Sequence, residues 1–414
     1  MSDGGGEIAI VGGGIAGLAL ALGLHRRGIA CRVYEAAPDI KPIGVGITLL
    51  PHAMRELTAL GLADELARNA IENTECRFYN RFGQLLYSEP RGRFAGYPYP
   101  EFGIHRGVLH RVLFDAAVER LGCDRIITGS QLESLQLGAK SATLRFKSTA
   151  GGTGGHEVRA SVVVACDGVN SAVRKHLFPD EDVVFTGINT WRGVTRRKPI
   201  LDGRTYLRIG SLRTGKIVIY PIADNVDGEG RQLINWIAEI ECDTRAKNDW
   251  NKAGRLEDFL PVYENQRFDW LDVGDLIRES DQVFEYPMVD RNPLSRWTHG
   301  CVTLMGDAAH PMYPRGSNGA AQALIDARTL AEFMGGGGDP ISALHAYERA
   351  RIGVTSKVVL ANRANPPDLI NTTVEQLTGD QPFENLDAHI SQAELQSISE
   401  QYKKIAGFSM ADVV

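Results

Sequence analysis

Three glycines with the spacing of a phosphate-binding loop carry the clearest chemistry in this sequence. Gly12, Gly14 and Gly17 form a G-x-G-x-x-G pattern between the apolar run 8–11 and an Ala- and Leu-rich stretch over 15–27. The first glycine permits a tight turn, the second lets a pyrophosphate approach the backbone, and the third lets a helix lie close to the strand. The pattern therefore predicts a strand, a phosphate-binding turn, and a helix whose first N–H groups face the phosphates.

An acidic residue follows at the position where a dinucleotide-binding fold places its ribose ligand. Glu35 closes the strand expected over 30–34, about 20 residues after the glycines. Its carboxylate can accept hydrogen bonds from both ribose hydroxyls. The alternatives are a Gly-rich turn of some other α/β protein and, for Glu35, a solvated strand end.

Two further motifs follow apolar runs that read as buried strands. The first, A-C-D-G-V-N-S-A-V-R at 165–174, contains Asp167, and the second, L-M-G-D-A-A-H at 304–310, contains Gly306 and Asp307. Both motifs are expected at the carboxyl ends of strands, where α/β sheets bind their ligands. Either aspartate could instead cap a helix.

Composition and cysteine usage limit the class of protein. The chain has 414 residues, 43% of them hydrophobic and 23% charged, which is enough for two or three domains with a sizeable core. The net charge of −6 gives no basic field for nucleic acid. Six scattered cysteines without a C-x-x-C pair predict reduced thiols in a cytoplasmic protein, with no metal site. Residues 1–7 do not read as a signal peptide, and no apolar run approaches membrane-spanning length.

The order of strand-like and helix-like segments predicts an α/β (α+β) architecture in which a second domain is inserted into the first. Strand–helix alternation predicts a Rossmann-like dinucleotide-binding domain from residues 1–75, 101–180 and 288–362. Short β-branched and aromatic runs predict a mixed-sheet substrate domain from residues 76–100 and 181–287, and a helical tail is expected over 363–414. Individual helices are expected at 54–69, 249–263 and 392–405.

Taken together, the three motifs resemble those of the single-component FAD-dependent aromatic hydroxylases, the family of para-hydroxybenzoate and salicylate hydroxylases. The resemblance spans residues 7–362 in the family's motif order. Within the family, the chain is most similar to bacterial phenazine hydroxylases acting on methylphenazine carboxylate. That similarity rests on residues 44–47, 88–92, 104–107, 191–194, 250–251, 254–258, 286–291 and 312–314.

The resemblance implies a role for each motif toward FAD. Asp307 would hold a ribityl hydroxyl, Asp167 would lie near both FAD and NAD(P)H, and Arg106 would follow the ribityl–pyrophosphate stretch unless it is a surface ion-pair partner. Backbone N–H groups of the loop around Pro314 would face the N1–C2=O edge of the isoalloxazine. The expected FAD-binding residues are Gly12, Gly14, Gly17, Glu35, Arg106, Asp167, Gly306, Asp307, Pro314, Gly319 and Ala320, with Pro314, Gly316, Asn318 and Gly319 at the flavin edge.

Several neighbouring residues are expected to be structural. His310 should pack at the base of the loop, and the Y-E-x-x-R segment at 347–351 should stabilise a helix. Cys166 and Cys301 should be buried, unreactive thiols. One departure from the family stands two residues after Gly319, where many relatives carry Asn or Ser and this chain has Ala321.

The implied reaction is hydroxylation of an aromatic or fused heteroaromatic ring, with or without loss of a carboxyl group. NAD(P)H would reduce FAD, and the reduced flavin would react with O₂ to give a C4a-hydroperoxide, so no side chain is expected to act as the catalyst. Only one complete nucleotide loop with its acid is present, so NAD(P)H would bind transiently.

Apolar residues must exclude water from that chemistry. The candidates for this enclosure and for the substrate wall equally suit a protein core: Val45, Ile47, Leu49, Trp191, Tyr220 and Tyr313. Arg192 is a candidate partner for a substrate carboxylate.

Other functions share part of this pattern. A flavin-dependent halogenase should show W-x-W-x-I-P, which the sequence lacks, and a membrane quinone hydroxylase should have an apolar C-terminus, whereas 392–404 is polar. A reductase of the geranylgeranyl type and a non-catalytic FAD-binding protein are the alternatives that stay open. Oxygen uptake coupled to product formation would distinguish a hydroxylase from both. The expected partners are a small aromatic substrate and O₂, without nucleic acid or membrane, and a homodimer is the working expectation.

Overall fold

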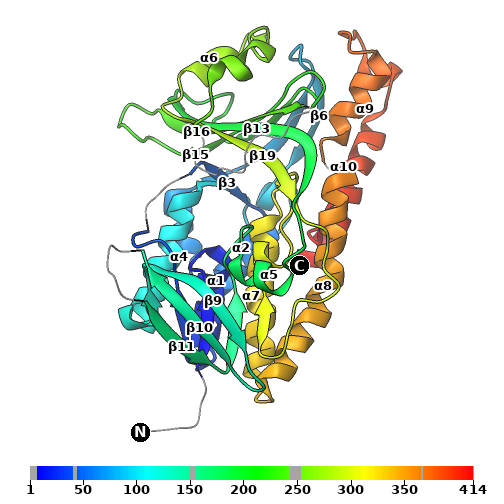
Figure 1. The fold of residues 1–414 in the computed structure, drawn as a ribbon. Coiled ribbons are helices and arrows are strands. Elements are labelled where there is room, and N and C mark those ends of the chain that lie inside the picture. Colours follow the sequence, from blue (N-terminus) through cyan, green and yellow to red (C-terminus); the bar gives the residue numbers. More distant parts are fainter. Residues whose placement is uncertain (1–6, 41–43, 150–154, 243–252, 365–366, 414) are drawn as a thin grey trace.

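A parallel sheet forms the centre of the lower half of the molecule in Figure 1. The computed structural model describes residues 7–40, 44–149, 155–242, 253–364 and 367–413. The sheet has five strands in the order β20-β12-β1-β2-β8, all parallel. Their bounds are Ile8–Val11 for β1, Cys31–Tyr34 for β2, Ile126–Ile127 for β8, Val162–Ala165 for β12 and Val302–Leu304 for β20.

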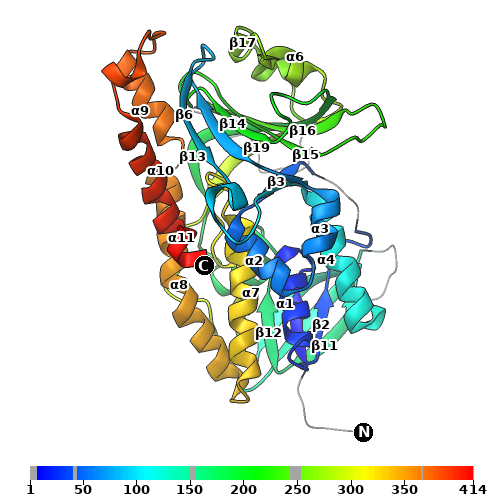
Figure 2. The same cartoon turned by 180° about the vertical axis from the view of Figure 1, so that it is seen from behind.

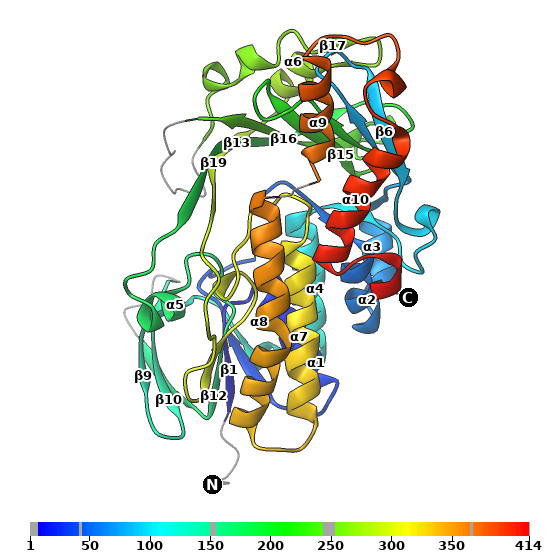
Figure 3. The ribbon, with the colours of Figure 1, turned by 90° about the vertical axis from the view of Figure 1, so that its right-hand side faces the viewer.

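Both faces of this sheet are covered, which explains why its strands are apolar throughout. Helices lie on one face and a three-stranded antiparallel sheet lies on the other, as Figure 3 shows. The helices are α1 (Ile15–His25), α4 (Arg106–Leu121), α7 (Gly319–Gly335) and α8 (Pro340–Ala364), and the antiparallel strands are β9 (Ser130–Leu137), β10 (Ala142–Ser148) and β11 (His156–Ala160).

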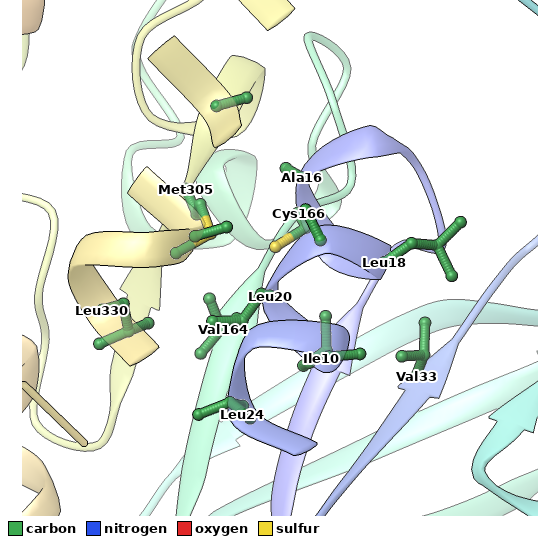
Figure 4. Packing of buried hydrophobic residues seen from close by; sticks show 14 of the residues in the cluster. Ile10, Ala16, Leu18, Leu20, Leu24, Val33, Val164, Cys166, Met305 and Leu330 are labelled. Atoms are coloured by element: carbon green, nitrogen blue, oxygen red, sulfur yellow. The ribbon is translucent and has the colours of Figure 1, made fainter. Parts of the chain in front are cut away.

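Figure 4 shows how the central strands meet α1. Ile10 and Val164 project from neighbouring strands toward Leu20 of the helix, and all three side chains are fully buried. Burying side chains of this size contributes about 1.5–3 kcal/mol each. This packing fixes α1, and therefore the start of α1, relative to the carboxyl ends of the strands.

A seven-stranded mixed sheet forms the upper half of Figure 1. Its order is β19-β13-β16-β15-β14-β5-β6, antiparallel except for the β14–β5 pair. The strands come from two separate stretches of chain, as an inserted domain requires. They are β5 (Glu75–Tyr79), β6 (Leu85–Pro90), β13 (Val184–Arg197), β14 (Thr205–Ile209), β15 (Lys216–Ala223), β16 (Gln232–Glu241) and β19 (Val283–Asp290).

Side chains of the large sheet alternate between two hydrophobic clusters. On its outer face, Ile217, Ile219 and Trp236 pack with α6 (Val273–Arg278). On its inner face, Val218 and Tyr220 pack with residues of the C-terminal tail.

Two elements connect the halves. A small antiparallel sheet of β3 (Gly46–Leu49), β7 (Phe102–His105) and β4 (Ile71–Glu72) lies beneath the large sheet, where the Gly46 N–H donates to Asn235 Oδ1 at 2.7 Å. The tail runs along one side of the molecule beside α8 (Figures 2 and 3). It comprises α9 (Leu369–Thr378), α10 (Gln392–Ala406) and α11 (Met410–Val413).

Some expected elements need correction. The single helix expected over 54–69 is two helices, α2 (Pro51–Ala59) and α3 (Ala63–Asn69), because Gly61 between them adopts a positive φ of 74°. The helix expected over 249–263 is wrong for its described part, which contains two short 3₁₀ turns around Pro261, while residues 249–252 lie outside the described residues. The helix expected over 392–405 is confirmed as α10. None of the helices in the described part of the chain has both the length and the apolarity that a membrane crossing needs.

Candidate functional site

The three sequence motifs and Glu35 meet at one edge of the parallel sheet. Gly12 follows β1, Glu35 follows β2, Asp167 comes two residues after β12, and Asp307 comes three residues after β20. These strands are neighbours in the order β20-β12-β1-β2, so their carboxyl ends lie side by side. The structure therefore brings together residues that are almost 300 positions apart in the sequence.

The three glycines of the first motif serve different purposes. Gly12 has a φ of +103°, and a Cβ there would overlap the carbonyl oxygen of Cys166. A Cβ on Gly17 would overlap the carbonyl oxygen of Gly12, so this glycine allows α1 to approach its own loop. Gly14 has no heavy atom within 4 Å of an added Cβ, which leaves open space at the start of α1. That open space, next to helix N–H groups without intrahelical partners, fits a pyrophosphate.

Glu35 is fixed against this loop by backbone donors. Its Oε2 accepts the Gly13 N–H at 2.6 Å, and its Oε1 accepts the Ala37 N–H at 2.7 Å. Each carboxylate oxygen keeps a second lone pair for a ribose hydroxyl. His110 of α4, which the sequence did not single out, holds the other side of the loop through Nε2 to the Gly13 carbonyl oxygen at 2.6 Å.

The Asp307 carboxylate has no hydrogen bond or ion pair to any described residue. It is exposed to solvent, yet the surrounding protein raises its pKa by desolvation, an effect opposed by the charges of His310 and Arg106. Protein therefore surrounds the Asp307 carboxylate on most sides, and solvent reaches it from one side. A Cβ on Gly319 would lie 3.9 Å from Asp307 Oδ1, so this free acceptor lies beside the first turn of α7.

Asp167 also has a structural role. Its Oδ2 accepts the N–H groups of Ala172 and Val173 at 2.8 and 3.3 Å, in the first turn of the short helix α5 (Ala172–Leu177). The N-cap residue of this helix is Ser171, so Asp167 supports the helix start without being its N-cap. The other oxygen, Oδ1, is buried without a partner, and burial raises the pKa of the carboxyl group.

The loop expected at the flavin edge leads into the first turn of α7. Gly316 adopts a φ of +90°, Pro314 is exposed, and Asn318 is the N-cap residue. The Asn318 side chain does not cap the helix but points away, toward His52 and the tail. The backbone N–H groups of the first turn, including those of Gly319 and Ala320, are therefore available at the helix start.

A buried ion network supports both loops from below. Asp326 of α7 binds His310 Nε2 at 2.6 Å and Arg351 Nε at 2.7 Å, and it accepts the Gly306 N–H at 3.2 Å. His310 is thus structural, as expected, but it has an acidic partner that the sequence did not reveal. Tyr347 and Glu348 of the Y-E-x-x-R segment bind backbone groups near β20, in keeping with the expected structural role.

The cysteines next to these loops are also placed as expected. Cys166 and Cys301 are buried, and burial raises the pKa of both thiols, which keeps them protonated.

Arg192 lies on the inner face of the large sheet, where no described residue forms a hydrogen bond or ion pair with it. Its guanidinium makes no hydrogen bond or ion pair with a described residue, and its buried Nε is unpaired. Desolvation lowers its pKa, and the charge of Glu239 opposes this shift without cancelling it. It lies over the ring of Tyr286, 5.6 Å from the centroid.

Arg106 approaches the same region from the start of α4. Its side chain is exposed and has no hydrogen bond or ion pair to the described residues. Burial dominates the pKa shifts of Asp307, Arg192 and Tyr286, and the charge of Arg106 adds a lowering contribution to each. The guanidinium groups of Arg192 and Arg106 therefore lie between the inner face of the large sheet and Asp307, without a hydrogen bond or ion pair to the described residues.

Trp191 does not line this region, which corrects one expectation. Because successive side chains of a strand alternate, Trp191 points to the outer face while Arg192 points to the inner face. The indole stacks on Phe259, with ring centroids 4.9 Å apart, in the same cluster as Trp236. Trp191 is a core residue of the large sheet.

The other expected wall residues are buried or partly buried near the junction of the two halves. Tyr220 stacks on Tyr206 on the inner face, with ring centroids 4.9 Å apart. Tyr313 packs against Ile188 and Met288, and its hydroxyl approaches the Val184 carbonyl oxygen at 3.4 Å. Val45 is buried, and Ile47 packs against the core of the lower half.

Comparison with known proteins identifies the family. The family model described as "FAD binding domain" matches residues 6–197 and 272–361, more than half of the chain. Phenazine 1,6-dicarboxylic acid hydroxylase PhzS of Lysobacter antibioticus is 42% identical over 364 residues, covering 86% of this chain and 89% of that protein. The chain belongs to the FAD-dependent aromatic hydroxylase family. It is an FAD-dependent aromatic monooxygenase.

Other relatives agree with this assignment. The 3-hydroxybenzoate 6-hydroxylase 1 of Aquipseudomonas alcaligenes is 30% identical over 372 residues, covering 86% of this chain and 88% of that protein. Among solved structures, the R204Q variant of Klebsiella pneumoniae HpxO complexed with FAD aligns with a TM-score of 0.75 at 21% identity, covering 99% of this chain and 98% of that chain. A salicylate hydroxylase substrate complex aligns with a TM-score of 0.72 at 21% identity, covering 100% and 98%. At this identity the two structures show the shared fold.

Proposed function

We propose that this enzyme uses NAD(P)H and O₂ to hydroxylate a fused heteroaromatic carboxylate of the phenazine type. The observation that carries the substrate class is the unpaired guanidinium of Arg192. A buried charge without a partner is costly, and a ligand carboxylate would compensate it through a bidentate pair. The named activity of the Lysobacter antibioticus relative, on a phenazine dicarboxylic acid, supports the same class.

The residues at the sheet edge fit FAD along its length. Bound FAD supplies the redox chemistry, since it accepts hydride from NAD(P)H and activates O₂ when reduced. The open space at Gly14 receives the pyrophosphate, Glu35 accepts the ribose hydroxyls, and Asp307 accepts a ribityl hydroxyl. The N–H groups of Gly319 and Ala320 donate to the flavin edge, where negative charge develops on reduction.

The inner face of the large sheet would bind the substrate. Arg192 neutralises its carboxylate, Arg106 follows the ribityl–pyrophosphate stretch of FAD, and the Tyr286 ring offers an aromatic surface beside Arg192. Val45, Ile47, Tyr220 and Tyr313 supply apolar surroundings that keep water from the reacting ring. Because the sequence has one complete nucleotide-binding loop, which FAD would occupy, NAD(P)H would bind only transiently. The cytoplasm would supply the NAD(P)H.

A substrate panel tests this proposal. Phenazine carboxylates, uncharged phenazines and simple benzoates are compared for NAD(P)H oxidation and O₂ uptake that yield hydroxylated product. Product analysis also distinguishes retention of the carboxyl group from its release as CO₂. Tight coupling with uncharged phenazines alone would refute the proposed substrate class.

Arg192→Met isolates the proposed carboxylate contact. Loss of a hydrogen-bonded charge pair costs about 1.5–3 kcal/mol, so KM for a carboxylated substrate should rise about 10- to 150-fold while FAD binding is unchanged. Arg196→Met is the matched control, because Arg196 is exposed on the same strand. Equal KM values for both variants would remove Arg192 from the substrate site.

A further inference from the structure

Helix α10 places a tyrosine directly against the loop at the expected flavin edge. The Tyr402 side chain is buried, and its hydroxyl lies 2.8 Å from the side chains of Asn318 and Asn362 and 3.1 Å from the Arg315 carbonyl oxygen. A Cβ on Gly316 would overlap this hydroxyl, so the loop has room for the tyrosine only because residue 316 is glycine. The family match ends at residue 361, and α10 lies outside it.

The donors and acceptors around Tyr402 form one consistent chain. Asn318 Nδ2 donates to the Tyr402 hydroxyl and to the Gly316 carbonyl oxygen at 3.1 Å. The hydroxyl in turn donates to Asn362 Oδ1, and Asn362 Nδ2 donates to the Tyr313 carbonyl oxygen at 2.9 Å. The chain therefore starts and ends on the loop, with Tyr402 as its middle member.

The remaining atom of the Asn318 amide is fixed from the other side. Its Oδ1 lies 3.0 Å from His52 Nε2. Burial lowers the pKa of His52 to about 3, so the ring is neutral and donates its single N–H to this oxygen. Phe408 of the tail stacks on the His52 ring, with centroids 5.1 Å apart. The tail thus holds Asn318 through two routes.

We propose that Tyr402 is a positioning residue for FAD, which sets the N–H groups of Gly319 and Ala320 at the flavin edge by acting through Asn318 and Gly316. Asn318 is the N-cap of α7, so a shift of its backbone moves the N–H groups of the first turn. Tyr402 itself touches the loop and not the cofactor. The inference depends on the FAD site and is independent of the substrate.

The test compares Tyr402→Phe with Ser399→Ala in the FAD-loaded enzyme. The Ser399 hydroxyl also joins α10 to the body, since it donates to Glu89 Oε2 at 2.7 Å, but this hydrogen bond does not involve the loop, Phe408 or His52. Two readouts need no substrate: the dissociation constant of FAD, and the affinity of the bound flavin for sulfite, which depends on donors at the N1–C2=O edge. For Tyr402→Phe, we expect FAD to bind about tenfold more weakly, which corresponds to ~1.4 kcal/mol, and sulfite affinity to fall about threefold or more.

For Ser399→Ala, both constants should stay within about twofold of the wild type, although the loss of stability should be similar. Equal changes in the two variants, or unchanged constants in Tyr402→Phe, would overturn the proposal. If Tyr402→Phe does not fold, Asn362→Ala decides, because it removes the acceptor of the Tyr402 hydroxyl and should shift both constants in the same direction. Unchanged constants there would also overturn it.

Discussion

Gly14→Ala separates binding of FAD from folding of its loop. Gly14 has a φ of −77°, which any residue adopts, and an added Cβ meets no heavy atom within 4 Å. The protein alone therefore tolerates the methyl group. The same methyl group would occupy the space in which we place the pyrophosphate.

The expected magnitudes follow from this geometry. Alanine is a poorer N-cap than glycine by some tenths of a kcal/mol, and it restricts the unfolded chain by about 0.4–1 kcal/mol, so the free energy of unfolding of the apoprotein should change by less than about 1 kcal/mol. Displacing one charge-assisted hydrogen bond of the pyrophosphate costs about 1.5–3 kcal/mol. The dissociation constant of FAD should then rise about 10- to 150-fold.

Two measurements on the apoprotein check this prediction: urea unfolding and titration with FAD. Gly17→Ala serves as the contrast, because its Cβ would overlap the Gly12 carbonyl oxygen and should destabilise the apoprotein itself. If Gly14→Ala bound FAD as tightly as the wild type, the pyrophosphate could not lie at the start of α1.

Three further variants test other parts of the structure. Asp307→Ala should weaken FAD retention about tenfold or more, because the side chain has no structural partner to lose; retention equal to wild type after gel filtration would remove Asp307 from the site. Trp191→Phe should lower the free energy of unfolding in urea without changing KM for substrate, and an altered KM with unchanged stability would contradict its outer-face position. Asp326→Asn should cost about 3–5 kcal/mol of stability at pH 7, since it leaves the buried Arg351 with hydrogen bonds to Gln322 but without its carboxylate partner. Burial opposes ionisation of Asp326, but His310 and Arg351 outweigh this effect and lower the pKa of Asp326 below 3.8. The stability that Asp326 contributes should therefore be present at neutral pH and be lost as the pH falls below about 3.8. Equal acid unfolding midpoints for the variant and the wild type would argue against this contribution.

Local sequence signals were sufficient for the dinucleotide loop and for the inserted sheet. The glycines, the strand before them and Glu35 lie within one βαβ unit, so their spacing alone defines the geometry. The motifs at Asp167 and Asp307 could be assigned to one sheet edge because parallel strands end together. The break at Gly61 was visible in the sequence, but the apolar periodicity on both sides of it favoured one helix.

Other parts of the site depend on contacts that leave no local trace. Either face of β13 could have pointed inward, and only the packing of Trp191 on Phe259 determines that Arg192 faces the lower half. The partner of His310 lies one helix away at Asp326. Tyr402 contacts Gly316, although the two residues are 86 positions apart in the sequence. The polar pattern of the tail helix therefore gave no indication of this contact.

The order in which the large sheet is completed has a consequence for synthesis of the protein. The inner-face cluster includes Leu395 of α10, about 100 residues after the last strand of the sheet. At about 5–20 residues per second, a ribosome needs roughly 5–20 s to add that stretch. During this interval the nascent chain carries an apolar sheet face that its own tail has not yet covered. Chaperone binding during translation, and aggregation of chains that stop before α9, should therefore concentrate on this one face.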